Sequence, residues 1–301
     1  MDTSNNLSPL LRAARFLVMC VSRLPMSVLY VFADLTYFIM YRVIRYRIKV
    51  VRSNLRLAFP SRTDSQLHAT EKAFYHHLAD YFFETIKGLT IGDEELLRRY
   101  VIRNPEVLRQ LTEQGKNVFL YGAHIGNWEW LTSLPLYYPD IQIQTFYQPQ
   151  RHAFSNAMTL QQRTRRGIVA VESQKGFRFM YKYVSSGAVS ITLILGDQCP
   201  HYAAQKYWVD FMGQDTPFLV GPEHIARKLN IALVYPSYVA YSRGHYEVEM
   251  RVIEPNPKEC PEQECTARFA DFLADDLERL PELWLWSHRR WKLKHEDESK
   301  S

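Results

Sequence analysis

Two residues whose types suit acid–base chemistry, His124 and Glu129, stand five positions apart in the segment GAHIGNWE, residues 122–129. On one continuous helix this spacing would place the two side chains about 140° apart, on different faces. Both can face one cleft if His124 lies in a turn between a strand and a helix, with Gly126 and Asn127 capping that helix. Glu129 then falls in the first helical turn, where a negative charge is favoured.

A carboxylate beside a histidine fixes the imidazole tautomer and stabilises its protonated form, which suits the pair to general-base chemistry. Pairs of this kind also occur as purely structural contacts. The glycines around His124, and its place after the apolar run NVFLY at 117–121, favour the catalytic interpretation. The structural interpretation stays open at this point.

The sequence offers this histidine no evident nucleophile to activate. It contains no Gly-x-Ser-x-Gly motif and no HEXXH-like metal motif, and no cysteine is adjacent to His124. The four cysteines are scattered without metal-ligand spacing, which is typical of reduced structural thiols. We therefore expect direct group transfer between two bound substrates, with neither a covalent enzyme intermediate nor a metal.

Two further polar clusters could contribute to such a site. The segment QRTRRG, residues 162–167, concentrates Arg163, Arg165 and Arg166 just before a predicted strand, which suits binding of a phosphate or an oxyanion. A solvated helix C-terminus, where cations are also favoured, explains the same arginines equally well. Asp197 follows another predicted strand in the segment GDQ, where it either joins the site or caps a turn.

Short apolar runs alternate with helical stretches through the middle of the chain, which predicts an α/β fold with a mostly parallel sheet flanked by helices. The predicted strands cover 117–121, 141–146, 168–171, 189–195, 231–240 and 246–253. The predicted helices cover 65–89, 104–115, 126–138, 152–165, 176–185, 219–229 and 262–280. Sites in such folds form in loops beyond the carboxyl ends of strands, where His124 and Asp197 both fall.

The N-terminal quarter has the composition of a membrane attachment. Residues 25–41 are apolar apart from Asp34 and a few Ser and Thr, but their helical length of about 25 Å is short for a bilayer span. The basic residues that follow, of the kind that anionic cytoplasmic lipids attract, are Arg42, Arg45, Arg47, Lys49, Arg52 and Arg56. Attachment to one leaflet is our preferred interpretation, while a spanning helix and a buried core helix stay open.

Two regions are therefore expected: residues 1–60 as N-terminal membrane-attachment helices, and residues 61–301 as a single α/β domain. The start of the sequence lacks a signal-peptide pattern, so we do not expect a secreted protein. A net charge of +5 is modest for 301 residues and gives little reason to expect a nucleic-acid partner.

Several of these segments together resemble the late lipid A acyltransferases of Gram-negative bacteria, the lauroyl and myristoyl transferases within the glycerolipid acyltransferase superfamily. The resemblance rests on LPMSVLYVFADLTYFIMYRVIRYRIKVVRSNLRLAFP near the N-terminus, on HIGNWE, RTRRG, GDQ and FMGQDTP, and on the terminal PELWLWSHRRWK. It spans nearly the whole chain, and the terminal string is its most specific part.

The resemblance implies a glycerolipid-acyltransferase-like fold and transfer of a fatty acyl chain from an acyl-carrier-protein thioester, without a cofactor. The acceptor would be a hydroxyl of a phosphorylated lipid A precursor, on the cytoplasmic face of the bacterial inner membrane. His124 would be the general base and Glu129 its acidic partner. The implied substrate-binding residues are Arg163, Arg166, Asp197 and Asn127. Of the two arginines, Arg163 is preferred as the contact to phosphate or to the thioester oxyanion.

Two departures from the family pattern bear on the acceptor. Glu129 stands where glycerolipid acyltransferases usually carry Asp, which points to the lipid A branch, whereas GDQ continues with Cys-Pro-His-Tyr rather than a Pro/Gly-rich run. Lysophosphatidate or an aminolipid is therefore the alternative acceptor, and a non-enzymatic membrane-attached protein is the remaining class. We expect the tryptophans of the terminal string to fasten the tail to the domain rather than to touch substrate.

Overall fold

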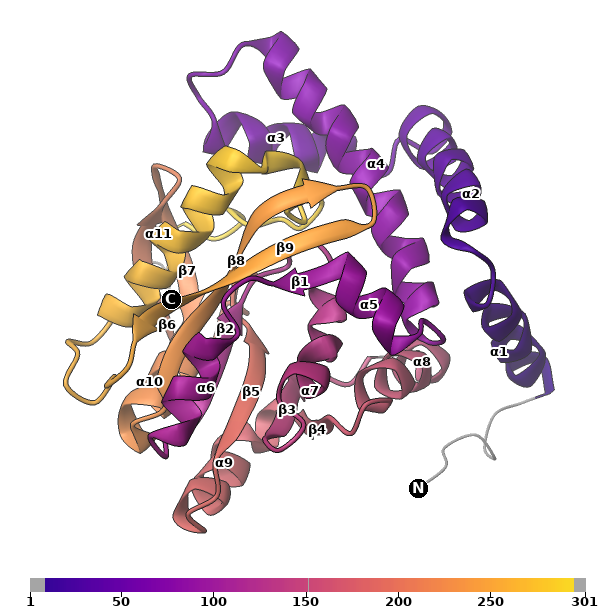
Figure 1. The fold of residues 1–301 in the computed structure, drawn as a ribbon. Coiled ribbons are helices and arrows are strands. Elements are labelled where there is room, and N and C mark those ends of the chain that lie inside the picture. The colour runs from indigo at the N-terminus through magenta and orange to yellow at the C-terminus, as the bar shows by residue number, and fades with distance from the viewer. Residues whose placement is uncertain (1–8, 151, 295–301) are drawn as a thin grey trace.

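The computed structural model describes residues 9–150 and 152–294, and a seven-stranded sheet forms its centre (Figure 1). The strands are β1 (Tyr100–Ile102), β2 (Val118–Gly122), β3 (Gln142–Tyr147), β4 (Val169–Glu172), β5 (Ser190–Leu195), β8 (Ala232–Ser242) and β9 (His245–Glu254). Their order is β1-β9-β8-β2-β5-β3-β4. The strands from β8 to β4 are parallel, β9 is antiparallel to β8, and β1 is parallel to β9. The predicted class, a mostly parallel α/β sheet, is confirmed.

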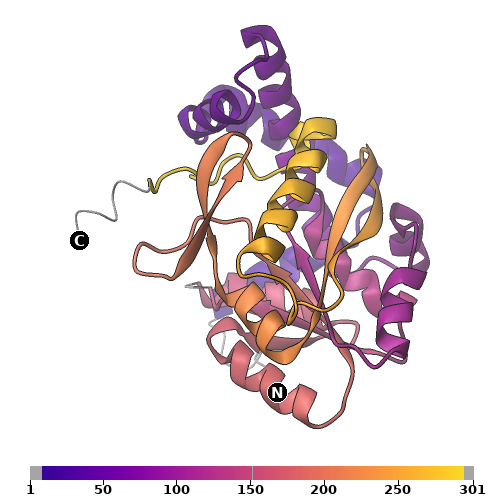
Figure 2. The ribbon, with the colours of Figure 1, turned by 90° about the vertical axis from the view of Figure 1, so that its left-hand side faces the viewer.

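Helices cover both faces of this sheet. They include α6 (Glu106–Glu113), α7 (Leu134–Tyr137), α8 (Ala153–Thr164), α9 (Gly176–Ser185), α10 (Gly221–Leu229) and α11 (Glu264–Arg279). Helices α9, α10 and α11 lie on one face, and α6 and α7 lie on the other (Figure 2). All five residues of β2 are buried, because a parallel strand between two helical layers has no face toward water. This is why the central strands were predictable from continuous apolar runs.

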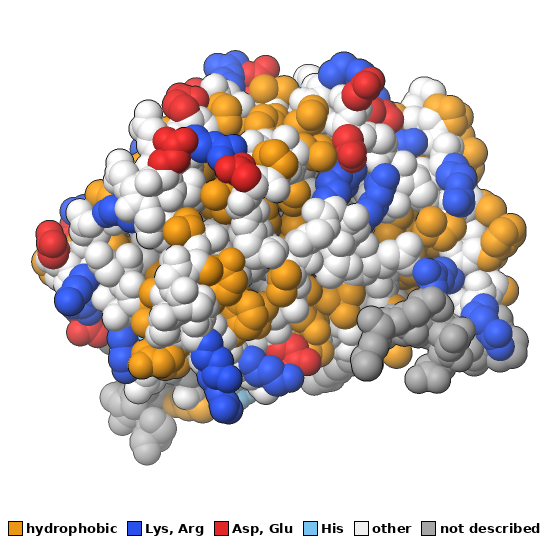
Figure 3. Space-filling view, turned by 60° about the horizontal axis from the view of Figure 1, so that its bottom comes forward, with side chains coloured by type: hydrophobic (Ala, Val, Ile, Leu, Met, Phe, Trp, Pro, Cys, Tyr) orange, Lys and Arg blue, Asp and Glu red, His pale blue; other side chains and the backbone are white. Residues whose placement is uncertain are grey.

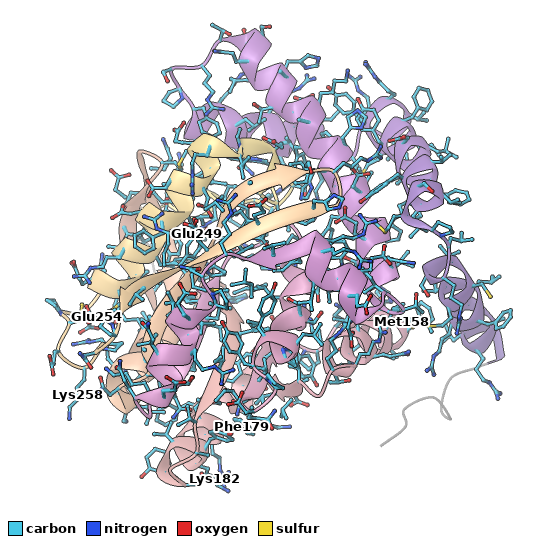
Figure 4. The ribbon with its side chains drawn as sticks, viewed as in Figure 1. Met158, Phe179, Lys182, Glu249, Glu254 and Lys258 are labelled. Carbon is cyan, nitrogen blue, oxygen red and sulfur yellow. The ribbon has the colours of Figure 1, made fainter. Side chains whose placement is uncertain are left out.

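The side-chain view places several elements relative to one another (Figure 4). Glu249 and Glu254 lie along β9, and Phe179 and Lys182 lie on α9 at the bottom of the molecule. Met158 belongs to α8, on the side of the molecule where the N-terminal helices lie. Of these residues, Lys182 is exposed and the other four are half-buried.

The predicted strands and helices agree with the structure within about two residues, apart from one helix. The helix predicted at 126–138 is wrong in its first half, where a 3-10 helix, η3 (Trp128–Ser133), precedes α7. Gly126 has a left-handed φ of 57°, and its N–H donates to the Leu283 carbonyl. Regular helical geometry therefore cannot begin at Gly126, and the chain turns before η3 starts.

A hairpin of β6 (Lys206–Phe211) and β7 (Gln214–Leu219) was not predicted, and neither was the three-residue β1. The hairpin turn is Met212-Gly213, and both residues have positive φ values, 57° and 69°. Such a turn usually carries Asn or Asp before Gly, so methionine there hides the signal. Pro217 within β7 also weakens the strand pattern. The hairpin stands beside α11 (Figure 2).

The N-terminal region is helical: α1 (Pro9–Ser22), α2 (Met26–Phe38), a π-helical turn η2 (Ile39–Val43), α3 (Ile48–Ala58), α4 (Asp64–Gly88) and α5 (Asp93–Arg99). Helix α2 packs on α4 through one face, formed by Met26, Leu29, Ala33 and Tyr37. The capping box of Thr63 and Gln66 defines the start of α4, which the sequence predicted one residue later. One face of α2 therefore joins the core.

The opposite face of α2 and η2 is apolar and exposed. The exposed hydrophobic side chains are Val28, Val31, Phe32, Leu35, Phe38, Ile39 and Val43. Within the described residues, Met26–Val43 is the one helical segment long and apolar enough to cross a membrane, and 28% of it is buried. Figure 3 shows hydrophobic and basic side chains interspersed along the edge formed by α1 and α2. An apolar face bordered by cations suits contact with a membrane surface.

Candidate active site

The candidate site lies where β2 and β5 end side by side. Gly122 pairs with Leu195 at the carboxyl ends of these parallel strands, so the residues that follow each strand come together. His124 follows β2 and Asp197 follows β5, and His124 Nδ1 lies 2.7 Å from Asp197 Oδ1. The pairing of adjacent parallel strands therefore creates a contact between residues 73 positions apart in sequence.

Glycine at position 196 permits this contact. A Cβ at Gly196 would lie 2.1 Å from the Tyr121 ring, which is far inside any allowed contact. The Tyr121 ring is fully buried and stacks on Phe269, with ring centroids 4.0 Å apart, so it has little freedom to move away. The glycine of GDQ lets the chain pass over Tyr121 and carry Asp197 to the imidazole.

Asp197 is held as an anion by its hydrogen-bond donors. Burial alone would raise the pKa of this carboxyl, but His124 and the indole of Trp284 outweigh burial and lower the pKa to about 2. Trp284 Nε1 donates to Asp197 Oδ2 at 2.7 Å. Because an ionised carboxylate can only accept hydrogen bonds, His124 Nδ1 carries a proton, and in the neutral imidazole Nε2 is then the acceptor.

The free nitrogen of the imidazole points to the exposed side of the site. The side-chain amide nitrogen of Gln198 lies 3.2 Å from His124 Nε2, and Gln198 is exposed. An exposed glutamine is easily displaced, so a substrate hydroxyl can take its place at Nε2. The ring of Trp128 meets the imidazole edge-on, with centroids 5.0 Å apart, and forms one wall beside it.

A second ion pair, between Glu129 and Arg163, lines the same cavity as Trp128. Arg163 Nε donates to Glu129 Oε2 at 3.0 Å, and Arg163 Nη2 donates to Oε1 at 2.5 Å. The carboxylate in contact with the imidazole is thus Asp197, whereas Glu129, which the sequence predicted as the acidic partner of His124, contacts Arg163. The reason is the left-handed turn at Gly126, after which Glu129 lies in the first turn of the 3-10 helix η3 and meets α8 instead.

Trp128, Glu129 and Arg163 also line a small, largely apolar cavity of about 40 Å³. Its other lining residues are Leu131, Thr132, Thr145, Phe146, Ile168, Leu193 and Leu195. The cavity is formed between η3, β3, β5 and the end of α8. It is an apolar recess with an ion pair in its wall, next to the histidine.

Two of the predicted substrate-binding residues make contacts within the protein. Arg166 forms an ion pair with Asp93 at 2.8 Å and donates to the Ile91 carbonyl, so it fastens the end of α8 to the loop before α5. Asn127 is fully buried and donates to Glu84 Oε2 at 2.8 Å. The prediction that Asn127 caps a helix is also wrong, because its side chain makes no cap hydrogen bond.

The C-terminal string contributes to the site in a way that the sequence did not reveal. The Gly126 N–H donates to the Leu283 carbonyl and the Leu285 N–H donates to the His124 carbonyl, both at 3.0 Å. This short antiparallel bridge brings Trp284 to Asp197. The tryptophan does fasten the tail, as expected, but it also holds a residue of the site. An indole can donate only one hydrogen bond, and the sequence alone does not identify its acceptor.

Within the described residues, no cluster of three or more His, Cys, Asp or Glu side chains suits a metal ion. The groups available for chemistry are the His124–Asp197 pair, the Glu129–Arg163 pair and the apolar recess beside them. These groups lie at the carboxyl edge of a parallel sheet, as in many α/β enzymes. The histidine can exchange a proton with a substrate, and the recess beside it suits an apolar part of that substrate.

Comparison with known proteins narrows this class. The sequence pattern of the bacterial lipid A biosynthesis acyltransferases matches residues 11–293, and the chain belongs to this family. No curated protein sequence matches the chain. The chain is therefore an acyltransferase of lipid A biosynthesis, a class that requires an acyl donor and a lipid A precursor as acceptor.

Proposed function

We propose that this enzyme transfers a fatty acyl chain from an acyl-carrier-protein thioester to a hydroxyl of a lipid A precursor, with His124 as general base. The observation that carries the proposal is the His124–Asp197 contact of 2.7 Å, which orients the imidazole so that its Nε2 lies beside an exposed, displaceable Gln198. A base with this geometry takes the proton of an acceptor hydroxyl that replaces the glutamine amide.

The proposed reaction proceeds without a covalent enzyme intermediate. As His124 Nε2 takes up the hydroxyl proton, the acceptor oxygen attacks the thioester carbonyl and forms the new C–O bond. The C–S bond of the tetrahedral intermediate then breaks. The imidazolium gives its proton to the leaving thiolate, which regenerates the neutral His124. Asp197 stays ionised throughout and stabilises the imidazolium during the intermediate.

Arg163 is our candidate for the group that faces the developing negative charge. Its guanidinium is held by both oxygens of Glu129 in the wall of the apolar recess, beside the Trp128 ring that also touches His124. Preorganised donors near a thioester oxyanion or a substrate phosphate lower the barrier because they need no reorganisation during the reaction. Glu129 then positions Arg163, rather than assisting the base directly.

The recess beside this ion pair is our candidate for the part of the site that receives the acyl chain. It is lined mostly by apolar side chains from η3, β3 and β5, such as Leu131, Phe146 and Leu193, which suits contact with hydrocarbon. The chain length of the donor therefore depends on residues from several distant segments.

The exposed apolar face of α2 and η2 supports the location that we propose, the cytoplasmic face of the bacterial inner membrane. The face points away from the core, and the basic residues 42–56 follow it directly. Anionic cytoplasmic lipids attract such a segment. In this arrangement the acceptor lipid stays in the membrane and the acyl carrier protein approaches from the cytoplasm.

A complementation experiment tests the proposed acceptor. Lipid A is extracted from a deletion strain that carries either the wild-type gene, the His124→Ala variant or an empty vector, and its mass is measured. We expect lipid A lighter by one acyl chain in the last two strains. A normal lipid A mass in the deletion strain, with a change in phospholipids or aminolipids instead, would contradict the proposed acceptor.

A further inference from the structure

Helix α4 separates the exposed apolar face of α2 from the candidate active site. It contacts both α2 and η3, and Figure 1 shows it between α2 and the sheet. Toward α2, the ring of Phe83 stacks on Phe32, with centroids 6.3 Å apart. Toward the site, the ring of Tyr81 stacks on Trp128 at 4.1 Å, and Trp128 meets the His124 imidazole at 5.0 Å. Residues within one turn of α4 therefore contact both regions.

The residue between Tyr81 and Phe83, Phe82, has an exposed aromatic side chain. It is 56% exposed, and its ring meets Phe83 edge-on with centroids 5.3 Å apart. Phe32, on the apolar face of α2, is 44% exposed. The contacts from Phe32 through Phe83 to Phe82 therefore extend this apolar surface onto α4. Successive residues of a helix differ in direction by about 100°, so the surface reaches the side of α4 next to Tyr81.

A second contact joins the N-terminal helices to the site through α8. Helix α1 also exposes large apolar side chains, Phe16 and Leu17. In the same helix, the Met19 sulfur accepts a hydrogen bond of 3.9 Å from the Gln161 side-chain amide of α8. Two residues further along α8, Arg163 lines the apolar recess. The exposed apolar helices therefore adjoin both α4 and α8, which supply or support the walls of the site.

The occupant that suits this surface is the hydrocarbon of a membrane lipid. Contiguous exposed apolar side chains, especially with a polar rim, mark interaction sites. Cations border the surface: Arg23 lies between α1 and α2, and Arg42 and Arg45 follow α2, all of them exposed. An apolar surface edged by cations fits lipid chains with anionic headgroups. This family requires a lipid A precursor as acceptor, so the acceptor itself has the matching chemistry.

We propose that Phe82 and the stacked Tyr81–Trp128 pair bind a hydrocarbon chain of the acceptor lipid and guide its hydroxyl from the membrane to His124. The inference rests on the proposed function, in which the acceptor stays in the membrane while His124 Nε2 takes its proton. Phe82 contacts the chain at the membrane boundary, and Trp128 contacts it beside the imidazole. The donor acyl chain arrives on a soluble carrier, so it needs no surface continuous with the membrane.

The test is the KM for a lipid A precursor embedded in vesicles of anionic phospholipid, measured on the full chain. The vesicle concentration is high enough to bind all of the enzyme, as checked by flotation, and the mole fraction of acceptor is varied. In Phe82→Ser we expect the acceptor KM to rise about tenfold, because apolar contact to the chain is lost. The kcat and the KM for the thioester donor should stay at their wild-type values. Phe82→Leu keeps an apolar side chain and should keep the acceptor KM within about twofold.

The matched control is Phe38→Ser. Phe38 lies on the apolar face of α2 and is 54% exposed, so it matches Phe82 in type and exposure. Its replacement should weaken vesicle binding but leave the acceptor KM of the bound enzyme unchanged. Both substitutions alter exposed side chains, so both variants should keep the wild-type melting temperature.

Three outcomes overturn the inference. An unchanged acceptor KM in Phe82→Ser shows that the ring does not touch the acceptor, and an equal rise in Phe38→Ser assigns both rings to membrane attachment alone. A rise in the donor KM instead of the acceptor KM assigns the surface to the donor chain. Wild-type-like activity in His124→Ala would overturn the proposed function itself, so the two failures are distinguishable.

Discussion

At the scale of single residues, the two carboxylates of the site, Asp197 and Glu129, have different partners and different roles. Asp197 contacts the imidazole and the Trp284 indole, and the Glu129 carboxylate accepts hydrogen bonds from the Arg163 guanidinium. Both carboxylates are nearly buried, so each anion depends on its partner for stability. The two pairs therefore respond differently to substitution.

Asp197→Asn tests the role of the carboxylate on His124. The amide can donate a hydrogen bond to Nδ1, which moves the imidazole proton to Nε2 and blocks the base. We expect kcat to fall by about a thousandfold or more. Trp284→Phe removes one hydrogen bond to Asp197 but leaves its charge, and should cost about tenfold or less. An Asp197→Asn enzyme with wild-type kcat would contradict the assigned tautomer.

Glu129→Gln tests the second pair. It leaves the guanidinium of Arg163 without its counter-ion, and we expect the free energy of unfolding to fall by about 2–3 kcal/mol. The double variant Glu129→Gln/Arg163→Met should recover most of this stability, measured by urea denaturation, yet stay impaired in acyl transfer. Recovery of full activity along with stability would show that the pair is only structural.

At the scale of elements, the site depends on two connections between distant parts of the chain. The turn after β2 is bridged to the segment after α11 by backbone hydrogen bonds of 3.0 Å at His124 and Gly126. The second connection runs through Glu84 of α4, which accepts a hydrogen bond from the Tyr30 hydroxyl of α2. The same carboxylate accepts one from the side-chain amide of Asn127, in the loop that follows His124. The helix with the exposed apolar face is thereby connected to the loop that carries the histidine.

The exposed face of α2 gives a prediction about membranes. Val31→Glu places a charge at a position that is 66% exposed, so the fold should be unaffected while the apolar face is interrupted. We expect binding to vesicles with anionic lipids, measured by flotation, to weaken about tenfold or more. Val252→Glu, at a 39% exposed position on β9, serves as the control. Equal binding by Val31→Glu and the wild-type protein would exclude this face as the attachment surface.

At the scale of the whole molecule, Glu84 joins four parts of the fold. Its carboxylate is fully buried and accepts hydrogen bonds from Tyr30, Asn127 and Tyr246, and its backbone carbonyl accepts one from Trp130. Despite these donors, burial raises the pKa of Glu84 to about 6. The folded protein therefore binds this proton more tightly than the unfolded chain does.

The stability of the protein should consequently depend on pH in a defined window. The contribution of Glu84 is fully present below about pH 4.5 and is lost as the pH rises through 6, amounting to about 2 kcal/mol. Glu84→Gln, which cannot ionise, should lack this loss when urea midpoints are compared between pH 4.5 and 7.5. Glu94→Gln, at an exposed position, is the matched control. Parallel pH curves for Glu84→Gln and the wild-type protein would contradict the assignment.

The parts of the fold that sequence patterns predict are those with local causes. The buried parallel strands and the amphipathic helices follow from apolar runs and periodicity, and the place of His124 and Asp197 after strands follows from the same pattern. The partner of each carboxylate could not be predicted, because it depends on strand order and on one left-handed turn at Gly126. The contact of Trp284 with Asp197 likewise joins segments 87 residues apart.

We propose His124 as the general base of a direct acyl transfer. The most direct test is single-turnover transfer from a radiolabelled acyl-carrier-protein thioester to a lipid A precursor, by purified wild-type and His124→Ala enzymes with matched thermal stability. We predict a loss of about a thousandfold or more in the variant, and no label attached covalently to the wild-type enzyme. Wild-type-like transfer by folded His124→Ala, or a labelled acyl-enzyme, would contradict the account.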